Sequence, residues 1–240
     1  IFPEGGGQLS DQGKLDDAKV SYAADKGGDV IHYADKAFAP GQKVHVTLDW
    51  PIRMDRMQQH TGEHILSYAF WKSCGANNIG FHMNEDMVTI DLDKEVNQEE
   101  VNKAENLANL EIWQNKQISA TYMNDSEVAK LTMRKKNENI HGAIRIVAID
   151  NGDICTCCGT HFPQTGAIGL IKVLRFEKHK GGTRVVFNCG ARALKNMQER
   201  NIVLVDTSNM LSVKEVDVPE AVTRLKTELV ELAAQSKERT

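Results

Sequence analysis

The 240-residue sequence predicts an α+β protein with a mainly antiparallel sheet. Short runs of alternating or apolar residues recur with the period of strands, and other segments repeat apolar residues every three or four positions, as helices do. Helical and strand segments follow one another in irregular order, which argues against a doubly wound parallel sheet. A hydrophobic content of 41% is enough to bury a sizeable core.

The first fifty residues predict a small β-domain. Their strand-like runs are interrupted by turn-forming glycines, and residues 44–48 alternate like a strand. Pro51 marks a boundary after which the pattern becomes helical. From about residue 57 to 72, apolar residues recur at helical spacing: Ile65, Leu66, Ala69 and Phe70.

The later elements are predicted in the same way. An acidic amphipathic helix spans about residues 98–114, and Ser126 is placed to cap a short helix. Gly181-Gly182 is the expected turn of a hairpin. Strands are expected at 87–92, 118–122, 144–149, 168–176 and 184–188. A last amphipathic helix carries a stripe of Val218, Val222, Leu225, Leu229 and Leu232.

Charge and cysteine usage narrow the class of protein. A formal net charge of −4 does not indicate a nucleic-acid binder, although local basic patches leave that function open. Five cysteines, three of them within residues 155–158, favour a reduced cytoplasmic protein over a disulfide framework. No apolar run is long enough for a membrane span, and no signal peptide is visible, although Ile1 is not a natural start.

Two clusters of basic residues are candidate phosphate contacts. Charge runs on hairpin tips more often only keep the surface soluble. One cluster lies on and around the predicted hairpin and contains Lys172, Arg175, Lys178, His179, Lys180 and Arg184. The other contains Lys130, Arg134, Lys135 and Lys136.

Two pairs of residues have the spacing of metal ligands. His60 and His64 lie one helical turn apart, so both imidazoles project from the same face. Cys157 and His161 form a second pair, in which Gly159 permits a sharp loop. Together they provide three nitrogen donors and one sulfur donor, a set suited to tetrahedral zinc. Either pair alone also occurs by chance, and Cys158 competes with Cys157 as the thiolate.

A second interpretation uses the same histidines. His-x-x-Glu-His is also the inverted metallopeptidase motif, in which Glu63 is the general base. Such a peptidase takes its third ligand, usually a carboxylate, from a downstream helix. Glu138 is a candidate, although its neighbours Lys135, Lys136 and Asn137 resemble a solvated loop. This interpretation leaves Cys157 and His161 without a role, so it ranks second.

The N-terminal motif Pro3-Glu4-Gly5-Gly6-Gly7-Gln8 is the other dense feature of the sequence. Successive glycines permit positive φ and close approach of a phosphate or ribose. A simple β-turn explains the same residues. The motif is neither a P-loop nor a dinucleotide fingerprint, because no Gly-Lys-Ser/Thr follows it.

In combination, these motifs resemble those of the AlaX proteins, the free-standing relatives of the editing half of alanyl-tRNA synthetase. The resemblance covers the chain to about residue 205. It rests on Phe2–Gln8 with Asp11 and Gly13, on Gln59–Leu66, on Gly80–His82 before Ile90–Leu92, on Cys157 with Gly159–His161, and on Cys189-Gly190 with Arg192-Ala193.

The resemblance implies hydrolysis of mischarged tRNA(Ala), chiefly seryl-tRNA(Ala), with glycyl-tRNA(Ala) accepted by some members. It implies one Zn²⁺ per chain on His60, His64, Cys157 and His161. It also implies an N-terminal β-barrel domain at 1–50, an editing domain at 51–210, and a C-terminal helix or linker at 211–240 toward a region used for tRNA contact and homodimerisation.

The sequence offers further candidate site residues. Gly6, Gly7 and Gln8 are expected to bind substrate, with His82 and Thr61 as candidates to line the amino-acid pocket, although either is equally an ordinary packed residue. Thr61 and Glu63 are the catalytic candidates.

The sequence departs from the family pattern at two positions. Cys158 replaces a glycine, and Glu63 stands where a neutral residue is common, so it is either an added base or a support for the metal ligands. Four protein ligands fill a tetrahedral zinc site. Catalysis therefore requires a fifth position, release of His161, or zinc that only orients the amino acid.

Overall fold

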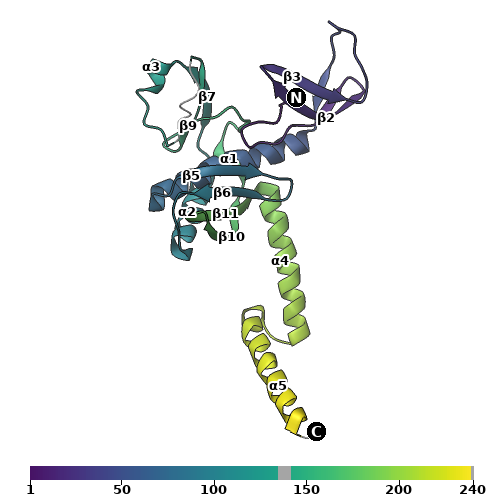
Figure 1. The fold of residues 1–240 in the computed structure, drawn as a ribbon, viewed down its shortest axis with the longest axis vertical. Helices are drawn as coiled ribbons and strands as arrows, with labels where there is room; N and C mark the ends of the chain where they lie inside the picture. Colours follow the sequence, from purple (N-terminus) through teal and green to yellow (C-terminus); the bar gives the residue numbers. More distant parts are fainter. Residues whose placement is uncertain (135–141, 239–240) are drawn as a thin grey trace. The chain divides into compact units, whose positions relative to one another are not determined.

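The computed structural model describes residues 1–134 and 142–238, so Lys135, Lys136 and Glu138 lie outside the described residues. The chain divides into two compact units, Ile1–Ala193 and Leu194–Thr240. In its described part, the first unit contains antiparallel sheets and two long helices (Figure 1), which confirms the α+β class. The expected domain boundaries at residues 50 and 210 stay predictions.

The N-terminal segment folds as a four-stranded sheet in the order β3-β2-β1-β4. Ala18, Val20 and Ala23 of the sheet are fully buried. Among the described residues β3 and β4 are the two edges of an open sheet, so the expected barrel is not confirmed. The strands are β1 (Gly13–Leu15), β2 (Ala18–Lys26), β3 (Asp29–Ala34) and β4 (Val46–Leu48).

The main core lies between a second sheet and two helices. Its strands, in the order β10-β11-β6-β5, are β5 (Asn78–Met83), β6 (Val88–Leu92), β10 (Ile171–His179) and β11 (Gly182–Cys189). Helices α1 (Trp50–Cys74) and α2 (Gln98–Trp113) pack against each other and against this sheet (Figure 1). The largest fully buried side chains include Leu66, Phe70, Ile90, Ile112 and Phe187.

Helix α1 begins seven residues before the expected residue 57. Asp49 caps it by accepting a hydrogen bond from the Ile52 amide, and Pro51 occupies the first turn, where its missing N–H costs nothing. The early turns were missed because Trp50, Ile52 and Met54 alternate as in a strand and do not recur at helical spacing. Gly75, with φ of 67°, ends the helix in the left-handed conformation.

A third sheet, in the order β7-β8-β9, carries the chain to Cys157. Its strands are β7 (Ile118–Met123), β8 (Ile144–Ile149) and β9 (Ile154–Thr156). The expected short helix is α3 (Asp125–Val128), but its cap is Asn124, whose side chain accepts from the Glu127 amide. Ser126 instead donates to the Asn124 side chain, so its predicted capping role was wrong.

Two other expectations were wrong near the end of the first unit. Residues 165–168 form a 3₁₀ turn, η1 (Thr165–Ile168), and β10 starts only at Ile171. The turn between β10 and β11 is Lys180-Gly181, with φ of 47° and 81°, rather than Gly181-Gly182. Helix α4 (Gly190–Leu211), which crosses from the first unit into the second, was not predicted.

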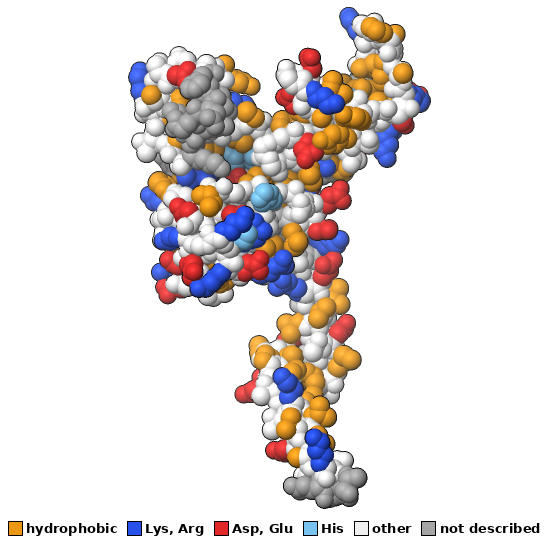
Figure 2. All heavy atoms as spheres, viewed as in Figure 1, with side chains coloured by type: hydrophobic (Ala, Val, Ile, Leu, Met, Phe, Trp, Pro, Cys, Tyr) orange, Lys and Arg blue, Asp and Glu red, His pale blue; other side chains and the backbone are white. Residues whose placement is uncertain are grey.

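The second unit continues α4 through η2 (Glu215–Asp217) into α5 (Val218–Glu238), and α5 confirms the predicted C-terminal helix. Figure 2 shows hydrophobic side chains gathered along both helices. The exposed ones include Ile202, Val203 and Met210 on α4 and Leu225, Leu229 and Leu232 on α5. Within the described residues, no helix is both long enough and apolar enough to cross a membrane.

Candidate metal centre

Helix α1 presents His60 and His64 from a buried stretch of the first unit. The two imidazole rings lie close together because residues four apart share a helix face, and their centroids are 5.3 Å apart. Gly62, between them, faces β11, and a Cβ there would overlap the sulfur of Cys189. The glycine of the motif therefore lets α1 approach the sheet closely.

The loop after β9 supplies Cys157 and His161. Arg145 of β8 fixes this loop, because its guanidinium donates to the carbonyl oxygens of Cys157 and Gly159 at 2.7 and 3.0 Å. A Cβ on Gly159 would lie only 2.5 Å from Nδ1 of His60. The loop thus reaches the histidines because residue 159 has no side chain.

The structure brings the four predicted ligands together. One donor atom from each of His60, His64, Cys157 and His161 lies within 4.8 Å of the others. The Cys157 sulfur is 3.2 Å from Nε2 of His60 and 3.3 Å from Nε2 of His161. Bonds of about 2.0–2.3 Å to a tetrahedral zinc place its ligand atoms about 3.3–3.8 Å apart, close to these separations.

Cys157 and His161 have charge states that suit a cation. Burial raises the pKa of the Cys157 thiol, but the charge of His64 and the hydrogen bond with His161 outweigh it and hold the pKa at about 2. Burial, followed by the neighbouring charge of His64, lowers the pKa of His161 to about 3. A thiolate beside a neutral imidazole is the state in which both groups bind zinc. Burial lowers the pKa of His64, but the nearby Cys155 and Cys157 outweigh it and raise that pKa, so His64 must lose a proton to bind a metal.

Each of the three histidines has a polar contact outside the cluster. Nδ1 of His60 is 2.8 Å from Oε1 of Gln8, and Nδ1 of His161 is 3.3 Å from the Thr61 hydroxyl. Nδ1 of His64 is 3.5 Å from Asp153 and 3.1 Å from the sulfur of Cys155. Such contacts orient metal-binding imidazoles and fix which nitrogen is free to bind.

Asp153 extends the contact of His64 into the protein. Its carboxylate accepts two hydrogen bonds, at 2.8 and 2.9 Å, from the guanidinium of Arg134, and both side chains are almost fully buried. Burial raises the pKa of the Asp153 carboxyl, but His64 and Arg134 lower it well below its usual value. Arg134 is therefore part of the protein interior and not the surface phosphate contact that the sequence suggested.

Glu63 is buried beside His64. Its Oε1 accepts hydrogen bonds from Ser67 at 2.8 Å and from Asn78 at 2.6 Å, while Oε2 lies 3.7 Å from Nε2 of His64. The carboxylate is thus held in one orientation with its second oxygen directed at a metal-ligand candidate.

Other predicted residues lie outside the cluster. Cys158 is exposed and belongs to neither of the two groups of described residues that could hold a metal: one contains Cys157, and the other consists of His64, Asp153 and Cys155. His82 is exposed on β5, and it is the neighbouring Phe81 whose ring packs on His60, with centroids 5.4 Å apart. Gly6 and Gly7 form an exposed turn that leads into the buried Gln8.

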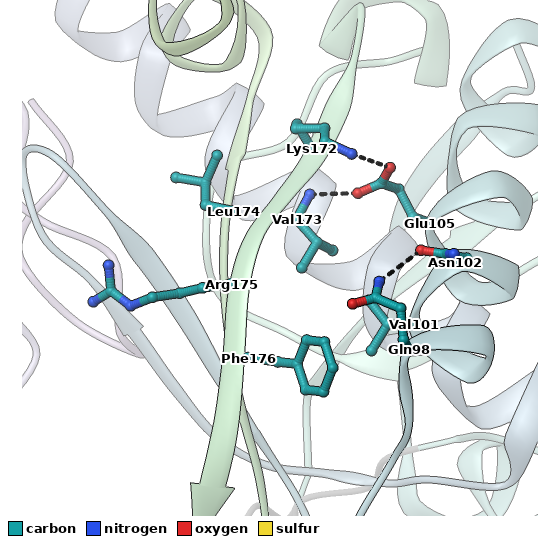
Figure 3. Close-up of a pocket in the computed structure, with 9 residues that line it drawn as sticks. All are labelled: Gln98, Val101, Asn102, Glu105, Lys172, Val173, Leu174, Arg175 and Phe176. Carbon is teal, nitrogen blue, oxygen red and sulfur yellow. Dashed lines mark hydrogen bonds and ion pairs between the residues drawn. The ribbon is translucent and has the colours of Figure 1, made fainter. Parts of the chain in front are cut away.

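Three lysine and arginine residues of the predicted basic cluster on the hairpin are paired with acids. Lys172 contacts Glu105 at 2.6 Å, Lys178 contacts Glu95 at 2.8 Å, and Arg184 forms two bonds of 2.7 Å with Asp91. Lys172 and Glu105 line a hollow of about 280 Å³ between α2 and β10. Figure 3 shows these two side chains facing each other, with Arg175 pointing to the other side of the strand.

Sequence reasoning missed Asp153, Arg134 and Phe81 as neighbours of the centre. It also assigned Gln8 to substrate rather than to His60. The only local signal is the position of Asp153 and Cys155 just before Cys157.

Comparison with known proteins defines the class first. Residues 144–186 match the family model of the threonyl and alanyl tRNA synthetase second additional domain. This segment contains β8, β9 and the Cys157–His161 loop. The segment with the Cys157–His161 loop is therefore similar to a domain named for two aminoacyl-tRNA synthetases.

Curated relatives narrow the class to a family. The chain is 36% identical over 208 residues to the alanyl-tRNA editing protein AlaX-L of Pyrococcus horikoshii, covering 83% of this chain and 52% of that protein. It is 32% identical over 227 residues to the alanyl-tRNA editing protein Aarsd1 of Danio rerio, covering 90% and 55%. The chain belongs to the AlaX family of alanyl-tRNA editing proteins.

The same region occurs within a larger enzyme. The chain is 32% identical over 238 residues to the alanine–tRNA ligase of Pyrococcus furiosus, covering 93% of this chain and 26% of the ligase. The chain thus spans about half the length of the curated editing proteins it matches and about a quarter of the ligase.

Proposed function

We propose that this protein is a zinc-containing aminoacyl-tRNA deacylase that hydrolyses mischarged tRNA(Ala), chiefly seryl-tRNA(Ala). The observation that carries the proposal is the convergence of His60, His64, Cys157 and His161 in a chain whose relatives are named alanyl-tRNA editing proteins. Its substrate in trans is tRNA(Ala) bearing serine, with the glycyl ester as the second substrate.

The donor set fits one Zn²⁺ per chain. Nε2 of His60 and Nε2 of His161 both face the Cys157 sulfur, and a single proton satisfies only one of these contacts, whereas a cation satisfies both. A zinc ion held there supplies a Lewis acid for ester hydrolysis. The amide of Gly159, which donates to the Cys157 sulfur at 3.3 Å, stabilises the thiolate.

Other side chains of the site are assigned separate roles in the reaction. We assign Glu63 to accept the proton of the attacking water, because its carboxylate is held by Ser67 and Asn78. Thr61 is fully buried with its hydroxyl near His161, so it acts by orienting that ring. His82 and the Gly6-Gly7 turn, both exposed, remain the candidates for contact with the substrate.

Selection against alanine has a physical basis. An apolar pocket discriminates groups that differ by one small substituent by only about 1–3 kcal/mol, whereas a site that hydrogen-bonds a hydroxyl discriminates far more strongly. We therefore propose that the serine hydroxyl is recognised by a hydrogen bond. Four ligands leave open whether His161 yields its place, whether a fifth position is used, or whether zinc orients only the amino acid.

The function is tested by a deacylation assay with seryl-, glycyl- and alanyl-tRNA(Ala) in parallel. We expect serine to be released at least about a hundredfold faster than alanine, with each rate corrected for spontaneous hydrolysis. Equal release of serine and alanine would contradict the proposed specificity. Binding of tRNA without deacylation would identify a non-catalytic tRNA-binding module instead.

Glu63→Gln is expected to lower kcat for seryl-tRNA(Ala) by about 10²–10⁴-fold while zinc content stays at one per chain. The amide keeps the shape and the contacts with Ser67 and Asn78 but does not accept the proton. Steady-state kinetics and metal analysis measure the two effects, and Glu99→Gln on the exposed face of α2 is the matched control. Loss of zinc with kcat preserved would make Glu63 a support for His64 instead.

The peptidase interpretation gains no support. Its proposed third ligand, Glu138, lies outside the described residues, and Cys157 and His161 complete the donor group without it. Cleavage of a peptide library that is abolished in the Glu63→Gln variant would revive the interpretation.

Localisation and assembly stay proposals. The five free thiols support a reducing compartment, and we propose the cytoplasm. The exposed apolar side chains of α4 and α5 support a homodimer formed through the C-terminal region (Figure 2).

A further inference from the structure

Gln8 lies at the end of the exposed glycine turn but is itself 1% exposed. Two backbone hydrogen bonds between Gly5 and Gln8, at 3.0 and 3.1 Å, close the turn, and Gly6 and Gly7 have φ of 59° and 84°. Two successive positive φ angles strongly favour glycine. The turn therefore reverses the chain and sends the Gln8 side chain inward.

The contacts of the Gln8 carboxamide identify its oxygen. The backbone amide of Thr160 donates to Oε1 at 3.0 Å, and an amide N–H has only a proton to offer, so the atom it faces is the oxygen. The amide nitrogen of Gln8 donates to the Thr160 hydroxyl at 2.9 Å, which agrees with this orientation.

The same oxygen determines the tautomer of His60. Nδ1 of His60 lies 2.8 Å from Oε1 of Gln8. Because a carboxamide oxygen only accepts, Nδ1 must carry the proton. In the neutral ring Nε2 is then unprotonated, and Nε2 is the atom that lies 3.2 Å from the Cys157 sulfur.

Packing leaves His60 little freedom to turn away. A Cβ on Gly159 would lie 2.5 Å from Nδ1 of His60 and 2.9 Å from Oε1 of Gln8. Phe81 packs on the ring of His60, and a Cβ on Gly7 would lie 2.5 Å from Phe81. The glycine turn and the Cys157 loop thus enclose both partners of the hydrogen bond.

We propose that Gln8 is a positioning residue that holds His60 in the Nδ1-protonated tautomer and so presets Nε2 as a metal ligand. The proposal rests on the proposed zinc centre, but not on the identity of the tRNA. It gives the glycine-rich motif a function in assembling the metal centre, in addition to any contact with substrate.

The test compares Gln8→Leu with Gln8→Glu in the whole chain. Leucine removes the acceptor, and we expect zinc affinity, measured by competition with a chromophoric chelator, to fall about 10–100-fold. Glutamate keeps an oxygen acceptor for Nδ1–H of His60. We therefore expect the zinc affinity of this variant to lie within about threefold of that of the original chain. Gln12→Leu, the same change four residues later, is the matched control and should leave affinity unchanged.

The second readout is the tautomer itself. Long-range ¹⁵N–¹H NMR correlations of the His60 ring in the zinc-free protein should report Nδ1–H in the original chain and in Gln8→Glu, and a mixture of tautomers in Gln8→Leu. Unchanged affinity in Gln8→Leu, or an Nε2–H ring in Gln8→Glu, would overturn the proposal. Neither measurement involves deacylation, so a protein that binds zinc in this way but does not hydrolyse seryl-tRNA(Ala) would refute only the proposed function.

Discussion

His60→Ala is expected to lower kcat/KM for seryl-tRNA(Ala) by about a thousandfold or more and to lower the zinc content of the purified protein. The variant removes one of four converging donors, and the Cys157 sulfur loses its neighbour at 3.2 Å. A metal ion contributes several kcal/mol of transition-state stabilisation, and each 1.36 kcal/mol corresponds to a factor of ten in rate. Deacylation kinetics and metal analysis on the same preparation measure both effects.

Metal removal is the companion experiment. Dialysis against a chelator should abolish deacylation by the original chain, and added zinc should restore it. His45→Ala, at an exposed position in the N-terminal segment, is the matched control and should keep both zinc and activity. Full activity of zinc-free His60→Ala would exclude the metal centre as the site of the reaction.

The ligand histidines could be predicted because their relationship is local. Residues four apart on a helix share a face whatever the rest of the chain does, so spacing alone identifies His60 and His64 as a pair. Gln8 and Asp153 reach the same histidines from 52 and 89 residues away along the sequence. Periodicity contains no information about contacts at that separation, so the residues that support the ligands emerge only from the fold.

Runs of charged or apolar residues also led to wrong predictions, because a run by itself shows neither burial nor the type of secondary structure. Arg134 stands beside Lys135 and Lys136 and therefore resembles a solvated patch, yet its guanidinium is buried against Asp153. Helix α4 was missed because Ile202-Val203-Leu204-Val205 is a continuous apolar run, which does not distinguish helix from strand. The regular stripe of α5 was found because its apolar residues are separated by charged ones.

Asp153→Ala is expected to lower the free energy of unfolding by about 3–5 kcal/mol. The variant leaves the guanidinium of Arg134, whose side chain is 4% exposed, without its carboxylate in the protein interior. An unpaired buried charge is costly because little water replaces the lost partner. Urea titration at neutral pH measures the change, and Asp17→Ala, which breaks an exposed ion pair with Lys36, should leave the transition unchanged.

The design separates this loss from any loss of zinc. Asp153 also contacts His64, so the variant is expected to bind zinc more weakly. When zinc is present, this weaker binding accounts for part of the loss in the free energy of unfolding. In the presence of chelator only the Arg134 contribution remains, and it should still account for most of the 3–5 kcal/mol. The double variant Arg134→Met/Asp153→Leu should recover much of that loss, because an apolar pair leaves no charge unpaired. A chelator-treated Asp153→Ala protein as stable as the chelator-treated original would mean that the buried ion pair contributes only through His64.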